Sequence, residues 1–151
     1  MLLSGAGAAP LPNNLSLENA AVLIVDDEPF IALDLAMAVE DAGGLIVGPA
    51  GSVREALALL RHSDIAGAIL DVNLSDGDVS PVVEILIERG IPLLLQTGGV
   101  VPHNLKIRYP DLLVFAKPFA SDNLVQKLAE LLHLTLPRAP ERDRNNFTMS
   151  I

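Results

Sequence analysis

The chain has 151 residues, of which 50% are hydrophobic, with no cysteine, no tryptophan and a formal net charge of −9. This length fits one domain with short extensions, and the absence of cysteine excludes disulfides and thiolate chemistry. No apolar run approaches the roughly 20 residues of a membrane span, and an acidic chain is poorly suited to neutralising nucleic-acid phosphates. We therefore expect a cytoplasmic protein that binds neither a membrane nor nucleic acid directly.

The two ends of the chain are rich in residues that interrupt regular structure. Residues 1–20 contain Gly5, Pro10 and Pro12 and are expected to form a flexible leader. Residues 21–134 are predicted to form the folded domain, and residues 135–151 a flexible tail. Because about 15 residues cannot build a second domain, we expect no DNA-binding or catalytic output module on this chain.

Five short apolar runs within 21–134 predict β-strands, over residues 21–26, 45–49, 66–71, 91–96 and 112–116. Helical stretches separate these runs, and such alternation is typical of a parallel sheet with helices on both faces. Right-handed crossovers then favour an α/β fold of the flavodoxin-like type. We expect a doubly wound, five-stranded parallel sheet with strand order 2-1-3-4-5.

Start and stop signals mark the first three helices. The first is predicted over Pro29 to Asp41, and Ser52 with Glu55 forms a capping box for the second. Ser80 is expected to cap the third helix, which Gly90 ends.

The last two helical stretches differ in strength. Residues 102–109 have few apolar anchors, so a short or irregular helix is expected there. Ser121 is expected to cap the final helix, which carries a leucine stripe on one face.

Polar side chains follow the apolar runs at the points where the strands end. Asp26 and Asp27 end the first strand, Asp71 the third, Thr97 the fourth and Lys117 the fifth. The carboxyl ends of parallel strands converge on one crevice. Carboxylates about 4 Å apart repel by about 4 kcal/mol at an effective dielectric constant near 20, and a hard divalent cation such as Mg²⁺ relieves that repulsion. The sequence therefore predicts a site for a cation and a phosphoryl group.

Four ordered motifs then resemble the receiver domain of bacterial two-component response regulators. They are Val22-Leu-Ile-Val-Asp-Asp-Glu-Pro29, Ile69-Leu-Asp-Val-Asn73, Thr97-Gly98 and Lys117-Pro-Phe119. The resemblance runs from about residue 21 to 134. It implies a CheY-like, stand-alone response regulator that acts in signal transduction as a phosphoprotein.

The resemblance also implies roles for single residues. Asp71 would accept a phosphoryl group from a sensor histidine kinase or a histidine phosphotransfer protein. Asp27, Asp71 and the backbone carbonyl of Asn73 would ligate Mg²⁺, with Asp26 acting chiefly through water. The side chains of Thr97 and Lys117 would contact the phosphoryl oxygens, and the Lys117-Pro118 peptide bond would be cis. A changed surface would then signal to a downstream protein target, and a homodimer through the last strand and helices is plausible.

Two features qualify the resemblance. Many receivers place a switch tyrosine or phenylalanine three positions before the lysine, where this chain has Val114, and Phe115 is expected to point to the other face of the strand. The run Thr97-Gly98-Gly99 is similar to the receiver subgroup with the signature Phe-Ala-Thr-Gly-Tyr, called FAT GUY, whose members are often stand-alone.

Three alternatives compete with a phospho-accepting receiver. A pseudo-receiver would bind partners without phosphorylation, although it would have no need of the intact acidic residues and Lys117. A phosphatase would need an acid or base two residues after Asp71, where Asn73 stands, so the chain is not expected to be an enzyme beyond slow autodephosphorylation. A nucleotide- or flavin-binding fold would need a glycine-rich phosphate loop after the first strand, and the acidic sequence there argues against one.

Overall fold

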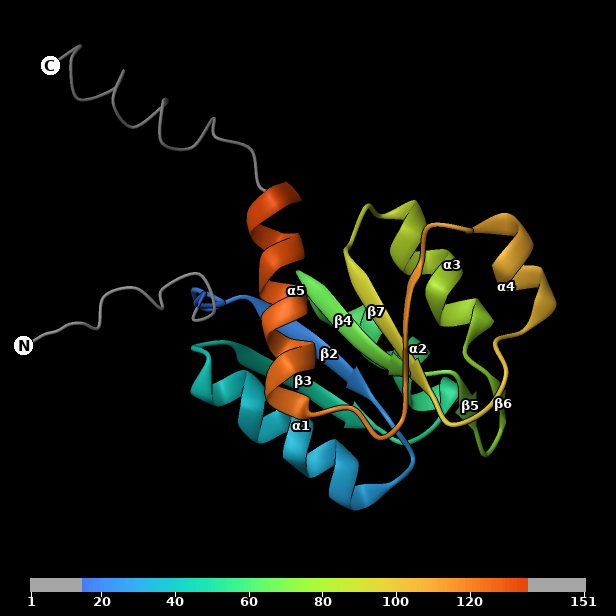
Figure 1. Ribbon diagram of the computed structural model, residues 1–151, viewed down its shortest axis with the longest axis horizontal. Helices are drawn as coiled ribbons and strands as arrows, with labels where there is room; N and C mark the ends of the chain where they lie inside the picture. Colours follow the sequence, from blue (N-terminus) through green and yellow to red (C-terminus); the bar gives the residue numbers. More distant parts are fainter. Residues whose placement is uncertain (1–14, 136–151) are drawn as a thin grey trace, which may run out of the picture.

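A computed structural model of the protein describes residues 15–135 (Figure 1). Residues 136–151 of the predicted tail and residues 1–14 of the predicted leader lie outside the described residues. The described chain folds into three layers, with a central sheet between two groups of helices. Of the helices over residues 15–135, none has both the length and the apolar character needed to cross a membrane.

The central sheet has five strands, all paired in parallel. Their bounds are β2 Ala21–Val25, β3 Leu45–Ala50, β4 Gly67–Asp71, β7 Leu93–Thr97 and β8 Leu113–Ala116. The spatial order is β3-β2-β4-β7-β8, which is the order 2-1-3-4-5 when the five strands are counted along the chain. The sheet and the flavodoxin-like topology predicted from the sequence are confirmed.

The helices are α1 Pro29–Asp41, α2 Val53–His62, α3 Ser80–Glu88, α4 His103–Arg108 and α5 Ser121–Thr135. One apolar cluster joins α1 and α5 to the sheet, and a second joins α2, α3 and Leu105 of α4 to it. In Figure 1, α1 and α5 lie in front of the sheet and α2 behind it. Both faces of the central strands are covered, which is why every residue of β4 and β7 is buried and why their sequences are apolar up to the polar residues Asp71, Gln96 and Thr97 at their carboxyl ends.

The predicted helix signals hold in part. The Ser52 hydroxyl accepts a hydrogen bond from the Glu55 amide at 3.1 Å, as expected of a capping box, and Gly90 follows α3 with φ +70°. The prediction that Ser80 caps α3 is wrong. Ser80 is already the first helical residue, and the Asp78 carboxylate accepts the hydrogen bond from its amide at 2.8 Å.

Two other helical predictions have clear outcomes. The short helix expected over 102–109 is α4, which has six residues. The prediction that Ser121 caps the final helix is wrong, because Ser121 is the first residue of α5 and its hydroxyl donates a hydrogen bond of 2.7 Å to the Asp34 carboxylate of α1. This hydroxyl therefore links two neighbouring helices.

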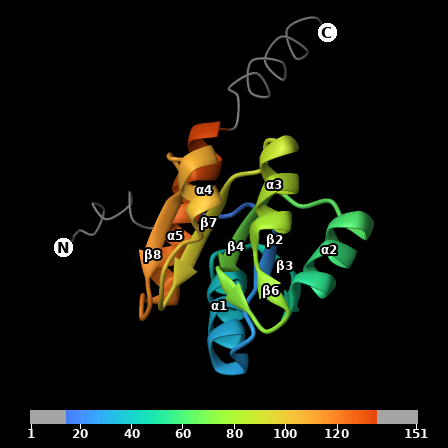
Figure 2. The same ribbon diagram turned by 90° about the vertical axis from the view of Figure 1, so that its right-hand side faces the viewer.

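A two-stranded hairpin that periodicity did not indicate follows β4. Asn73–Leu74 (β5) pairs antiparallel with Gly77–Asp78 (β6). The turn carries Asp76, whose carboxylate accepts hydrogen bonds from the amides of Val53 at 2.8 Å and Arg54 at 3.1 Å. The hairpin therefore lies against the start of α2 (Figure 2).

Residues 15–20 pack on the domain, although the sequence placed them in the leader. The Leu17 side chain is 4% exposed and belongs to the cluster under α1 and α5. Leu15 exchanges two hydrogen bonds with the Gln126 side chain of α5, at 3.0 and 3.1 Å. The Leu17 amide donates to the Ala42 carbonyl at 2.8 Å. The packed chain thus begins at least six residues before the predicted start at residue 21.

Candidate phosphoryl-acceptor site

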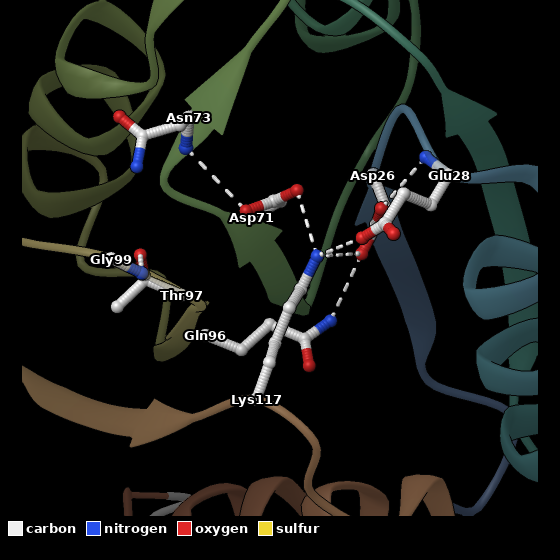
Figure 3. Close-up of polar contacts among 8 residues, drawn as sticks. All are labelled: Asp26, Glu28, Asp71, Asn73, Gln96, Thr97, Gly99 and Lys117. Carbon is white, nitrogen blue, oxygen red and sulfur yellow. Dashed lines mark hydrogen bonds and ion pairs between the residues drawn. The ribbon is translucent and has the colours of Figure 1, made fainter.

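The polar residues at the strand ends converge as the parallel topology requires. β2, β4, β7 and β8 all end at the same edge of the sheet, and Figure 3 shows the side chains that follow them gathered around one crevice. β2, β4 and β7 are fixed there by the apolar core on both faces, and β8 by its parallel pairing with β7.

Three carboxylates form the centre of the site. Asp26, Asp27 and Asp71 each offer an oxygen, and these three atoms lie within 4.8 Å of one another. Asp26 is 2% exposed and Asp71 5% exposed, whereas Asp27 is open to solvent. Such a group of oxygen ligands can hold a metal ion, and the exposed Asp27 gives solvent access to it.

Lys117 is the cation shared by this cluster. Its ammonium lies 3.0 Å from Asp71 Oδ2, 3.4 Å from Asp26 Oδ2 and 2.7 Å from Glu28 Oε1. Burial lowers the pKa of Lys117, but hydrogen bonds to Glu28 and Asp71 and the charges of Asp26 and Asp71 outweigh it, so the pKa is raised. Lys117 therefore stays charged and partly neutralises the carboxylates. The cis Lys117-Pro118 bond implied by the resemblance is present.

The pKa of Asp26 is raised by its position in the cluster. Burial is the largest cause that raises its pKa, to about 6, and the charge of Asp71 adds to the rise. A hydrogen bond from the Glu28 amide at 2.9 Å and the ammonium of Lys117 act in the opposite direction. A buried acid held partly neutral in this way gains from a nearby divalent cation.

Thr97 and Asn73 flank the acidic centre. Thr97 is buried, and its hydroxyl accepts a hydrogen bond from the Gly99 amide at 2.9 Å. The backbone amide of Asn73 donates to Asp71 Oδ1 at 3.4 Å. The Asn73 side chain is exposed and lies beside the crevice. All six residues that the sequence singled out are therefore at this edge of the sheet, with Thr97 engaged to the following loop.

Two further residues of the site were missed from the sequence. Glu28 completes the set of carboxylates around Lys117, although sequence reasoning considered it only as part of an acidic run. Gln96 is 2% exposed, and its side-chain amide donates to Asp26 Oδ2 at 3.1 Å. The sequence signal for Gln96 was an amide side chain directly after the apolar run Leu93-Leu-Leu.

No model of a known protein family matches the chain. Individual proteins, however, are similar to this chain in sequence or structure. The chain is 31% identical over 114 residues to the phyllosphere-induced regulator PhyR of Methylorubrum extorquens, a match that covers 74% of this chain and 43% of that protein. The solved structure of SdrG from Sphingomonas melonis is 39% identical, with a TM-score of 0.64, over 76% of this chain and 98% of SdrG. The response regulator PhyR of Brucella abortus is 28% identical, with a TM-score of 0.67, over 82% of this chain and 51% of that one.

The chain belongs to the receiver domains of two-component response regulators. The resemblance read from the four motifs is thereby confirmed. This receiver domain spans about half the length of the curated relatives it matches.

The receiver domain lacks an aromatic side chain at the position of the usual switch. Val114 is 39% exposed and lines a hollow of about 290 Å³ beside α4, together with Leu105 and Tyr109. Phe115 faces the opposite side of β8, where its ring lies 4.8 Å from that of Phe119. The two side chains therefore lie on opposite faces, as the alternation along a strand predicted.

Proposed function

We propose that this receiver is a single-domain response regulator that accepts a phosphoryl group on Asp71. The observation that supports this most directly is the position of the Asp71 carboxylate. It is nearly buried, it lies 3.0 Å from the Lys117 ammonium, and it lies beside two further aspartates whose oxygens could share a cation. A structural ion pair would need one carboxylate, whereas this lysine contacts three.

The step that we propose is a phosphoryl transfer from a phosphohistidine. An oxygen of Asp71 forms the new bond to phosphorus, the bond from phosphorus to the imidazole nitrogen breaks, and that nitrogen takes up a proton. Catalysis of such a transfer is mostly positioning and charge stabilisation. The Lys117 ammonium is placed to move from the carboxylates toward the incoming phosphoryl oxygens.

The donor set fits Mg²⁺, which prefers carboxylate, carbonyl and water oxygens. Asp27, Asp71 and the Asn73 backbone carbonyl would hold it, and Asp26 would act chiefly through water. When bound, the ion would neutralise the negative charge that builds up on the phosphoryl group.

The proposed partners follow from this chemistry. A sensor histidine kinase or a histidine phosphotransfer protein would supply the phosphoryl group in the cytoplasm. A downstream protein target would recognise the surface over residues 98–134 once it has changed. Since Asn73 cannot act as an acid or base, we expect slow autodephosphorylation and a role as a regulator.

Incubation with Mg²⁺ and acetyl phosphate, followed by intact-mass measurement, tests this function. We expect one phosphoryl group per chain, and none on Asp71→Asn. The matched control is Asp111→Asn, which changes an exposed aspartate at the opposite edge of the sheet and should be labelled like the parent. An unlabelled parent that also binds no Mg²⁺ would favour the pseudo-receiver, and label on Asp71→Asn would refute the site.

A further inference from the structure

Gln96 occupies an unusual place for an uncharged polar side chain. It is 2% exposed, and the three residues before it in β7 are leucines. Its amide nitrogen donates to Asp26 Oδ2 at 3.1 Å (Figure 3). Burial of an amide is unfavourable unless it is hydrogen-bonded, and the hydrogen bond to Asp26 offsets this for Gln96.

The two oxygens of Asp26 are held from different directions. The Glu28 amide donates to Oδ1 at 2.9 Å, and Gln96 donates to Oδ2. Lys117 also approaches Oδ2, at 3.4 Å, but it lies closer to Glu28 and Asp71. If Lys117 moves to a phosphoryl group on Asp71, Gln96 remains as the side-chain donor to Oδ2.

The backbone of Gln96 connects the same residue to the acceptor strand. Its carbonyl accepts a hydrogen bond from the Val72 amide at 3.1 Å, directly after Asp71. Its peptide bond leads into Thr97. Gln96 therefore contacts Asp26 after β2 and Val72 after the acceptor strand β4, and it directly precedes Thr97.

We propose that Gln96 is a positioning residue of the phosphoryl-transfer site, whose amide fixes the Asp26 carboxylate for cation binding. This inference rests on the proposed function and adds a residue to it. Partners that orient the ligands of a metal typically change its affinity by 10- to 100-fold when they are removed. Since Asp26 would act chiefly through water, the lower end of that range applies.

The test is Mg²⁺ binding to the unphosphorylated protein, measured by calorimetry. Gln96→Met keeps the length of the side chain and removes the donor, and we expect the Mg²⁺ dissociation constant to rise about tenfold. Leu94→Met is the matched control, because Leu94 is a fully buried residue two positions away on the same face of β7. It should bind Mg²⁺ like the parent.

Two further readouts separate positioning from a general disturbance of packing. With acetyl phosphate, Gln96→Met should need about tenfold more Mg²⁺ for its half-maximal rate, yet reach a plateau close to that of the parent. In an Asp26→Ala background, the change Gln96→Met should no longer alter Mg²⁺ affinity. A lower plateau, or an equal loss of affinity in both backgrounds, would overturn the proposal.

The failure of this inference differs from the failure of the proposed function. If the parent binds Mg²⁺ and is phosphorylated, but Gln96→Met has the same Mg²⁺ affinity, then only the role of Gln96 is wrong. If the parent binds no Mg²⁺, both proposals are wrong.

Discussion

The Asp76 carboxylate accepts a hydrogen bond of 2.8 Å from the backbone amide of Val53, 23 positions earlier in the chain. Asp76 lies in the turn of the hairpin that follows Asp71, and Val53 is the first residue of α2. The first amides of a helix have no partner within the helix, and a carboxylate there is favoured by the helix dipole. The hairpin that follows Asp71 is thereby held to the start of α2.

Replacing Asp76 with alanine should destabilise the protein at neutral pH, because two helix amides lose their acceptor. The hydrogen bonds from Val53 and Arg54 lower the pKa of Asp76 below its ordinary 3.8. Stability from a group with a lowered pKa is present above 3.8 and is lost as the pH falls through the folded value. The urea midpoint of the parent should therefore exceed that of Asp76→Ala at pH 7, and the difference should shrink below pH 4. A difference that stays constant down to pH 3 would contradict this.

The buried acid Asp26 should give the metal-free protein an opposite pH dependence. Its pKa is raised to about 6, so the folded state binds a proton more tightly than the unfolded state does. Stability from this source is present below about pH 4 and is lost as the pH rises through 6, by at most about 3 kcal/mol.

Urea unfolding in the presence of a chelator, from pH 4 to 8, measures this contribution. The parent should lose stability relative to Asp26→Asn across that window, since the variant cannot ionise. Added Mg²⁺ should reverse the loss in the parent above pH 6. Parallel pH curves for the two proteins would show that Asp26 titrates normally.

Thr97→Ala should separate phosphorylation from the response to it. The hydroxyl now binds the Gly99 amide, which opens the loop before α4. Without it we expect acetyl phosphate labelling to stay within a few-fold of the parent, while the change of amide exchange over residues 98–109 with beryllofluoride becomes smaller. Thr97→Ser keeps the hydroxyl and should respond like the parent. Equal exchange changes in all three proteins would rule out this role.

Leu17→Ala tests whether residues 15–20 belong to the folded unit. The side chain is 4% exposed, and removal of such a leucine typically costs about 2–5 kcal/mol in the free energy of unfolding. Leu33→Ala, at a leucine of α1 that is 57% exposed, should change it by no more than about 0.5 kcal/mol. Urea denaturation of both variants measures these changes, and similarly small effects would place residues 15–20 outside the cooperative unit.

The order of the strands could be predicted because it depends on patterns that are strong and local. Five apolar runs alternate with helical stretches, and the right-handed crossover rule then leaves few arrangements. The candidate site followed from the same reasoning, since Asp71 and Lys117 each stand where a run ends. Because the strands are parallel, their carboxyl ends lie at one edge of the sheet, and this was enough to predict that Asp71 and Lys117 are close together.

The features that were missed depend on tertiary contacts. The hairpin strands have two residues each, too few for any periodicity. Leu17 is buried because Gly44 leaves room for it: a Cβ on Gly44 would lie 2.6 Å from Leu17 Cδ1. The sequence around Pro12 indicated flexibility, and it carried no sign of this close approach.

Gln96 was missed for a different reason. In a strand that is buried on both faces, an apolar run does not indicate where a single polar side chain points. Only the register of β7 against β4, which pairs Gln96 with Asp71, brings its amide to Asp26.

The hydrogen bond between Leu15 and Gln126 has a practical consequence. It brings the start of the described chain onto α5, and His133 Nε2 lies 3.0 Å from the Ser16 carbonyl near the other end. The two ends of the described range therefore lie beside the amino-terminal edge of the sheet, across the domain from the acidic crevice (Figure 1). A fluorophore attached at Ser16 or Leu134, which are both exposed, would lie away from the crevice. A donor and an acceptor dye attached at Ser16 and Leu134 would start close together and report the release of residues 15–20 from α5 as a loss of energy transfer.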